Sequence, residues 1–422
     1  MMILAIVLFV LTYIGMLVFP KWRPYIALGS AVLFVVLGIM PVKHLASAIN
    51  WNVLMMIAGT MGVVALMIDS KMPARLADMI VAKVPNVKMA TFMLSLFAGI
   101  VSAFIDNVAT VLMIAPIALE IAKKQKIDPV GMIIAIAVSS NLQGAATLVG
   151  DTTSIMLGGY AGMNFLDFFF FHGKPSIFWA VELGALCASC IILILFRKDT
   201  QKVDVKEYTE VECYFPTVLM CLIVVLLIAA SLIPNMPDMI NGYICMILMI
   251  IGIIYHIARK KKFSASLEIL KEIDFETLLL LFSLFIVVGG ITEAGVIDKI
   301  AEIFTKISGG SLFVIYSLLV WMSVVFSAFI DNIPYVMTML PVTKGIALSM
   351  GVDPTLLYFG LLSGATLGGN LTPVGASANI AAIGILRKNG YQVKNKDFFR
   401  IGVPFTLAAI IPAYIYFWLI YA

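Results

Sequence analysis

Apolar runs long enough to cross a membrane follow one another along almost the whole chain, with short polar stretches between them. Each run is close to the roughly 17 to 25 residues that a helix needs to span the hydrocarbon core of a bilayer. The clearest runs cover 2–19, 25–40, 51–68, 176–196, 214–232, 238–258, 275–294 and 401–421. Two longer apolar regions, 90–160 and 311–386, are interrupted by polar residues. The pattern predicts an all-α polytopic membrane protein.

The composition agrees with this prediction. Of the 422 residues, 62% are hydrophobic and only 12% are charged, whereas about a quarter of the residues of a soluble domain are charged. The first run has neither a preceding basic segment nor a cleavage site of small residues, so we expect a retained span rather than a signal peptide. In a membrane chain the distribution of Lys and Arg matters more than the net charge of +4, and nucleic acid is not indicated as a partner.

The second half of the chain repeats the first. Residues 102–154 align without a gap with 327–379, and 17 of these 53 positions are identical. Composition alone would give roughly four or five identities. The words "SAFIDN" at 102–107 and 327–332 are the clearest part of the match. We therefore predict a first repeat over 1–196, a cytoplasmic linker over 197–213 and a second repeat over 214–422.

Each repeat is predicted to contain about five transmembrane helices, one re-entrant hairpin and one broken helix. Because five is odd, the second repeat should be inverted relative to the first. The basic residues agree: 23 of the 28 Lys and Arg residues, Lys21 and Arg23 among them, fall on one predicted side. That side should be cytoplasmic, with both termini outside the cell (plasma or inner) membrane. The segments 71–84 and 296–306 are predicted to be interfacial amphipathic helices.

Polar residues interrupt the apolar regions at four places, two in each repeat. Unpaired backbone is tolerated at membrane depth only where protein or a water-filled cavity satisfies it, and transporters use such breaks to hold ions near the midplane. The hairpin tips and the breaks "NLQGAATLVGDTTS" (141–154) and "TLGGNLTPVGASAN" (366–379) are therefore the candidate substrate and ion site. The candidate residues are Asp106, Asn107, Asn141, Gly144, Thr147, Gly150, Asp151, Thr152, Thr153, Asp331, Asn332, Gly369, Asn370, Thr372, Gly375, Ser377 and Asn379.

Simpler interpretations of these residues stay open at this point. Asp106 and Asp331 are also suited to capping the helices that follow them, and the glycines are also suited to close helix packing. The pair Cys187 and Cys190 lies within an apolar run and is expected to pack there rather than to bind a metal. The chain has no ligand cluster for a resident metal, no nucleophile with a base and no phosphate loop, so an enzyme is not expected. No cofactor is expected beyond a coupling proton or sodium ion.

At the same residues the chain resembles the ion transporter superfamily. The words that carry the resemblance include "SAFIDNVATVLMIAPIALEI", "GAATLVGDTTSIMLGGYAGMNFLDFF", "SAFIDNIPYVMTMLPV" and "GGNLTPVGASANIAAIGILRKNGYQVKNKDFFRIGVP". They are most similar to the branch of arsenite permeases, pink-eyed-dilution P proteins and sodium/proton antiporters, and are distantly similar to the divalent anion:sodium symporters. The resemblance implies a homodimer with a fixed scaffold and a mobile transport domain that carries the hairpins and broken helices.

Two departures from the superfamily pattern concern the site. The dicarboxylate branch has Ser-Asn-Thr tips, and here Asp106 and Asp331 stand at the Ser position. The P-like branch has Gly-Asp-Pro-Pro-Asn in its first loop, where this chain has "GDTTS" at 150–154. Because of the first departure, the tips place two acids where the dicarboxylate branch would bind a doubly negative substrate.

These observations support three hypotheses about function. The first is proton- or sodium-coupled antiport or efflux of a small inorganic ion, of the sodium or arsenite class, by an elevator-type mechanism. The second is sodium-coupled symport of a dicarboxylate-like anion, and the third is a passive ion channel. An external ATPase subunit also stays open as a partner. Because Pro334 deprives the second tip of one N–H donor, we expect Asp331 to carry the proton and Asp106 to bind the cation.

Overall fold

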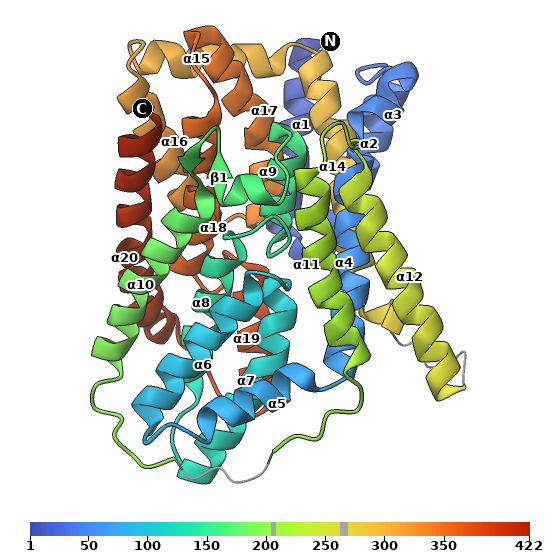
Figure 1. Ribbon diagram of the computed structural model, residues 1–422. Helices are drawn as coiled ribbons and strands as arrows, with labels where there is room; N and C mark the ends of the chain where they lie inside the picture. Colours follow the sequence, from blue (N-terminus) through green and yellow to red (C-terminus); the bar gives the residue numbers. More distant parts are fainter. Residues whose placement is uncertain (204–207, 262–268) are drawn as a thin grey trace.

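The computed structural model describes residues 1–203, 208–261 and 269–422, and this part of the chain is almost entirely helical (Figure 1). Its one sheet is a small antiparallel pair, β1 (Phe170–Phe171) and β2 (Lys174–Pro175). The predicted all-α membrane fold is therefore confirmed. Helices dominate because lipid offers no partner for backbone N–H and C=O groups, which a helix satisfies internally.

Six of the described helices are long and apolar enough to cross a membrane. They are α4 (Trp51–Asp69), α10 (Ile177–Leu195), α11 (Phe215–Leu232), α12 (Ile240–Lys260), α14 (Phe275–Glu293) and α20 (Asn395–Tyr421). Two bent pairs also pass this test when each is taken together: α1 with η1 and α2, and α15 with α16. Counting each pair as one span gives up to eight spans among the described residues.

The first two predicted spans differ from expectation. Helices α1 (Met2–Val18) and α2 (Arg23–Val36) are joined by η1 (Pro20–Trp22), and the pair is bent by 118°. Helix α2 has 14 residues and is therefore about 21 Å long, shorter than the roughly 30 Å hydrocarbon core. It stops before the predicted end at residue 40, because Gly38 takes a left-handed backbone (φ 69°) that ends the helix.

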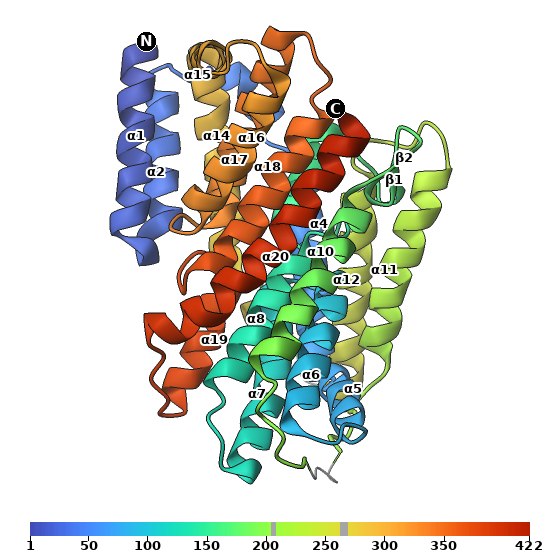
Figure 2. The same cartoon turned by 90° about the vertical axis from the view of Figure 1, so that its left-hand side faces the viewer.

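Each half contains a helical hairpin and a helix that is broken in its middle. The hairpins are α6 (Val87–Ser102) with α7 (Asn107–Gln125), and α16 (Leu312–Ser327) with α17 (Asn332–Met350). The broken helices are α8 (Val130–Gly144) with α9 (Thr152–Ala161), and α18 (Thr355–Gly368) with η4 (Gly369–Leu371) and α19 (Ser377–Lys388). In Figures 1 and 2 the α6–α7 hairpin lies toward the lower end of the molecule and α16–α17 toward the upper end.

Two short helices lie where amphipathic helices were predicted. Helix α5 (Met72–Val81) precedes the first hairpin and α15 (Val296–Ile307) precedes the second. Figure 1 shows them toward opposite ends of the molecule. The remaining short elements are η2 (Val42–His44), α3 (Leu45–Ala48) and η3 (Leu166–Phe168).

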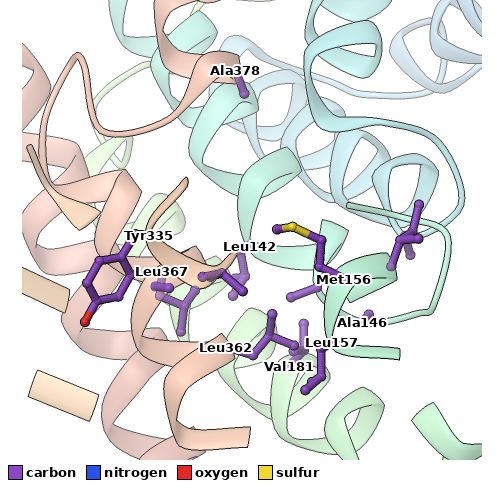
Figure 3. Packing of buried hydrophobic residues seen from close by; sticks show 14 of the residues in the cluster. Leu142, Ala146, Met156, Leu157, Val181, Tyr335, Leu362, Leu367 and Ala378 are labelled. Carbon is purple, nitrogen blue, oxygen red and sulfur yellow. The ribbon is translucent and has the colours of Figure 1, made fainter. Parts of the chain in front are cut away.

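The broken helices form the centre of the core. Every residue of α18 is buried, and α8 is buried over nearly its whole length. Contacts cross between the halves, since α19 packs on α7 and α8 while α9 packs on α17 and α18. Figure 3 shows apolar side chains from both halves, including Leu142, Met156, Leu362 and Leu367, gathered in this region. The polar breaks are thus held inside a packed apolar core.

Candidate ion-binding site

The two hairpin tips place an aspartate at the first turn of the helix that follows. Oδ2 of Asp106 accepts hydrogen bonds from the backbone N–H groups of Val108 (3.0 Å) and Ala109 (3.1 Å). Oδ1 of Asp331 accepts only one such bond, from the N–H of Ile333 (3.3 Å). The next residue after Ile333 is Pro334, which has no N–H to donate. Both acids therefore cap helices. Capping uses one carboxylate oxygen of each acid and leaves the other for a further partner.

The carboxylate oxygen that does not cap the helix has different partners in Asp106 and in Asp331. Oδ2 of Asp331 lies 3.2 Å from Nη1 of Arg23 and accepts a hydrogen bond from Oγ of Ser377 (3.1 Å). Within the described part of the chain, no hydrogen bond reaches Oδ1 of Asp106. Asp331 thus has a cationic partner, whereas Asp106 has none among the described residues.

The break in each broken helix packs directly against the hairpin tip of the same half. Oγ1 of Thr147 donates to the carbonyl of Ala103, and Oγ1 of Thr372 donates to the carbonyl of Ala328. The two contacts are equivalent under the repeat, since both threonines and both alanines stand at matched positions. The threonines therefore fasten each break to its tip rather than lining a cavity.

Three backbone carbonyls converge beside Gly150, and three more beside Gly375. A Cβ atom added to Gly150 would lie 2.6 Å from the carbonyl oxygens of Ser102, Ala103 and Gly144. A Cβ atom added to Gly375 would lie 2.7 to 2.9 Å from the carbonyl oxygens at 369, 327 and 328. Glycine is needed at both positions because a side chain would fill the space between the carbonyls. Each half thus forms a carbonyl cradle where its break meets its tip.

A chain of side-chain amides connects the two halves behind the tips. Asn107 donates to Oδ1 of Asn141 (3.0 Å), and Asn141 donates to Oδ1 of Asn370 (3.0 Å) and to the carbonyl of Thr366 (2.8 Å). Asn370 in turn donates to the carbonyl of Val138 (3.0 Å). A buried polar group without a partner is costly, so moving one break relative to the other would break these hydrogen bonds at a cost. The amides therefore hold the two breaks in a fixed relative position.

Two repeat-related polar atoms have no partner among the described residues. Oγ of Ser154 and Oδ1 of Asn379 are both buried and form no hydrogen bond, and the two residues stand at matched positions of the repeat. The amide nitrogen of Asn379 does have partners, the carbonyls of Gly369 (3.0 Å) and Thr372 (3.2 Å). Two buried oxygens at equivalent places are free to contact a ligand.

A small cavity of about 130 Å³ opens at the first tip. Its wall contains four carboxylates, which come from Asp106, Asp151, Glu272 and Asp274. The other polar lining residues are Asn107, Thr152, Thr277, Asn332 and Ser377, and among the described residues no Lys, Arg or His lines it. Asp151 is buried and accepts a hydrogen bond from Oγ1 of Thr153 (2.6 Å). The cavity is small, acidic and suited to a cation.

The predicted residues therefore separate into two groups. Six of them line the acidic cavity: Asp106, Asn107, Asp151, Thr152, Asn332 and Ser377. Thr153, Asn141, Asn370 and Asn379 and the glycines and threonines of the breaks form the packing and the carbonyl cradles behind it. Asp331 is not in the wall of this cavity. The two acids therefore do not face one common cavity in this conformation.

Comparison with known proteins places the chain in a family. A model described as the CitMHS citrate transporter family matches residues 6–364, which is most of the chain. The chain belongs to the CitMHS citrate transporter family. An uncharacterized transporter of Mycobacterium bovis is 30% identical over 437 aligned residues, covering 100% of this chain and 99% of that protein. The chain is thus a multi-pass membrane transporter.

Two further comparisons concern a more distant relative and the fold. The mouse P protein is 24% identical over 75% of this chain and 47% of its own length, so the resemblance to P proteins found in the sequence is confirmed. The crystal structure of the Alcanivorax borkumensis YdaH transporter covers 90% of this chain and 86% of its own, with a TM-score of 0.60 and 14% identity. At that identity the likeness concerns the fold alone.

Sequence reasoning missed four charged residues of this citrate transporter family member. Glu272 and Asp274 line the cavity from the segment just before α14, and their signal was an acidic pair before an apolar run. Glu182 was detectable as the one charged residue in the run 176–196, and it accepts two hydrogen bonds from Gln143 (3.0 and 3.1 Å). Arg23 gave no local signal, because its partner Asp331 is 308 residues away.

Proposed function

We propose that the protein is a secondary active transporter that couples movement of its substrate to a proton or a sodium ion bound at the acidic cavity. The observation that carries the proposal is the wall of four carboxylates without a described basic residue. Asp151 is buried and Asp106 is half-buried, whereas Glu272 and Asp274 are exposed. Carboxylates held close together favour the binding of a compensating cation. Ionisable groups at membrane depth are costly and are typically retained for ion or proton pathways.

The carbonyl cradles at Gly150 and Gly375 support a sodium ion as one of the bound species. Hard cations prefer oxygen ligands, and unwound backbone carbonyls are the groups that coordinate sodium in broken-helix transporters. The unpartnered oxygens of Ser154 and Asn379 lie at the start of α9 and in α19. Each half therefore offers carbonyl, hydroxyl or amide oxygens next to a carboxylate.

The first candidate substrate is a small inorganic ion of the sodium or arsenite class, moved by antiport. The volume of about 130 Å³ favours it, because drug-sized ligands occupy pockets of roughly 300 to 1,000 Å³. A proton and a sodium ion would then compete for the same carboxylates. Alternate occupation of one site by two cations is what antiport requires.

The second candidate is symport of citrate or a related carboxylate, which the family description favours. Within this cavity an anion with several negative charges would be repelled by the carboxylates, so it would have to enter together with cations. The amino ends of α7, α9, α17 and α19 supply backbone N–H groups that stabilise anions. Citrate transport would therefore still depend on the cation site.

We also propose the architecture that these movements require. The matched hairpins, breaks and cradles support two inverted repeats, 1–196 and 214–422, joined by the linker 197–213. Packing of α19 on α7 and of α9 on α17 supports one mobile transport domain built from both halves. An elevator-type movement of that domain against a scaffold in a homodimer would then carry the site across the cell membrane. The basic residues place the linker in the cytoplasm and both termini outside.

Flux measurements with purified protein in liposomes test the proposal. For antiport, an imposed pH gradient should drive ²²Na⁺ or arsenite flux. Substrate added outside should drive protons out of the lumen, which a trapped pH dye reports as a rise in internal pH. For symport, sodium or protons should enter with labelled citrate. A reversal potential set by one ion alone, without coupling, would indicate a channel and contradict the proposal.

Variants connect the flux to the cavity. Asp106→Asn and Asp151→Asn should each abolish coupled flux. The matched control is Asp128→Asn, because Asp128 is an exposed aspartate that accepts a hydrogen bond from the backbone N–H of Val130 (2.9 Å) and does not line the cavity. Coupled flux that survives in both cavity variants would mean that the two acids have only structural roles and that the cation binds elsewhere.

A further inference from the structure

The helix pair α1–α2 contacts the second hairpin at its tip. Arg23 at the start of α2 reaches Asp331, with Nη1 3.2 Å from Oδ2. Tyr13 of α1 donates to the carbonyl of Pro334 (2.7 Å) and is hydrogen-bonded to Oγ1 of Thr338. These contacts link segments that lie more than 300 residues apart in the chain. They fasten the start of α17 to the first two helices.

The two repeats differ at this point. Asp106 has no described basic partner, whereas the side chains of Arg23 and Asp331 are paired and only 17% and 9% exposed. A guanidinium stays charged under all physiological conditions. When one partner of an ion pair so far removed from water is lost, the other is left as a buried charge without a partner, which is strongly unfavourable. The tip of the second hairpin is thus already occupied by a cation that belongs to the protein.

The chain segment that leads to Asp331 also supplies part of the second carbonyl cradle. Two of the three cradle carbonyls belong to Ser327 and Ala328, which stand four and three residues before Asp331. Ser377, which donates to the same oxygen as Arg23, begins the helix that follows the cradle. A cation held in this cradle would therefore compete with Arg23 for Asp331.

Arg23 has a second partner that would hold it after displacement. Its Nε donates to the carbonyl of Met16 (3.3 Å) in the last turn of α1. The carboxyl end of a helix attracts positive charge because its last carbonyls are unpaired. The guanidinium could thus leave Asp331 without becoming an isolated charge.

We propose that Arg23 is a tethered counter-ion that occupies Asp331 when no small monovalent cation is bound there. Binding of sodium at the second cradle displaces Arg23 and releases the tip of α17 from α1–α2. The tip can then move only when the cation is present, which is a condition for coupling. This inference rests on the proposed function, because it needs a cation to reach the second tip.

Sodium binding to the purified protein tests the competition. We expect Arg23→Gln to lower the half-saturating ²²Na⁺ concentration by about fivefold or more, the lower end of the usual range of coupling between sites. Arg23→Lys should keep the competition, and Lys21→Gln should have no effect, since Lys21 lies exposed in the same turn. In an Asp331→Asn background, Arg23→Gln should change nothing further.

Spin labels provide a structural measurement that does not depend on transport. Trp22 stands next to Arg23, Phe329 stands two residues before Asp331, and both side chains are exposed. Cysteines placed at these two positions, in a background without native cysteines, can carry the labels. Replacing choline by sodium should lengthen or broaden the label separation in the wild type. Arg23→Gln should do the same without sodium, and Lys21→Gln should not.

The outcomes separate the two claims. If the wild type binds sodium but Arg23→Gln changes neither its affinity nor the label separation, the counter-ion proposal is wrong and the proposed function stands. If Arg23→Gln separates the labels while sodium binds without moving them, Arg23 is only a structural contact, and the proposal is also overturned. If no variant binds sodium, the sodium form of the proposed function fails first, and this inference fails with it.

Discussion

A methyl group added at Gly150 should damage cation binding more than it damages the fold. In Gly150→Ala the new Cβ would lie 2.6 Å from three backbone carbonyl oxygens, about 1 Å closer than an unstrained contact. Backbone groups of α6 and α8 cannot turn aside as a flexible side chain would. The carbonyls must therefore move apart, and they are the groups that form the first cradle.

The size of the effect follows from overpacking. Forcing one extra carbon into a packed interior typically costs about 1 to 3 kcal/mol. If that cost appears in the cation-bound state, sodium affinity falls by about 5- to 150-fold. A cost that appears already without the ion would instead lower the melting temperature. Measuring ²²Na⁺ binding and thermal unfolding on the same preparation distinguishes these cases.

Gly384→Ala is the matched control. Gly384 lies in α19, and a Cβ atom added there would meet no other atom within 4 Å. The same chemical change should therefore leave sodium affinity unchanged, and it should keep or slightly raise the melting temperature, because alanine suits a helix better than glycine. If Gly150→Ala behaves like Gly384→Ala in both measurements, the carbonyls beside Gly150 do not form a cradle.

Four other results are expected. Asp106→Asn should lose coupled flux and keep its thermal stability, because Asn caps a helix about as well as Asp; an unchanged pH profile of transport would contradict this. Gly375→Leu should insert into the membrane but not transport, and normal transport would make its break ordinary packing. A cysteine at Val203 should react with a membrane-impermeant maleimide only from the cytoplasmic side, and strong labelling from outside would refute the inverted topology. Lys71, 2.8 Å from Glu212, lowers the pKa of the Glu212 carboxylate. The difference in melting temperature between wild type and Glu212→Gln should therefore shrink as the pH falls through that lowered pKa. A difference that does not depend on pH would exclude the ion pair as its cause.

Much of the architecture was predictable from the sequence, because it follows from local requirements. An apolar run in lipid must form a helix to satisfy its own backbone, and this determined α4, α10, α11, α12, α14 and α20. The duplicated "SAFIDN" predicted two tips, and in both the aspartate caps the next helix. Even the missing donor at Pro334 was visible in advance, since proline lacks an N–H wherever it stands.

Other features depended on which helices pack together, and no local pattern carries that information. The pairing of Arg23 with Asp331, the acids just before α14 in the cavity wall and the amides that join Asn141 to Asn370 all connect distant segments. Sequence symmetry predicted matched tip positions for Asp106 and Asp331, but the neighbours of the two acids come from elements outside the repeated words. The sequence therefore determined where charge is buried, because burial and capping are local, whereas the tertiary structure decided which partner each charge has, because that depends on contacts between helices far apart in the chain.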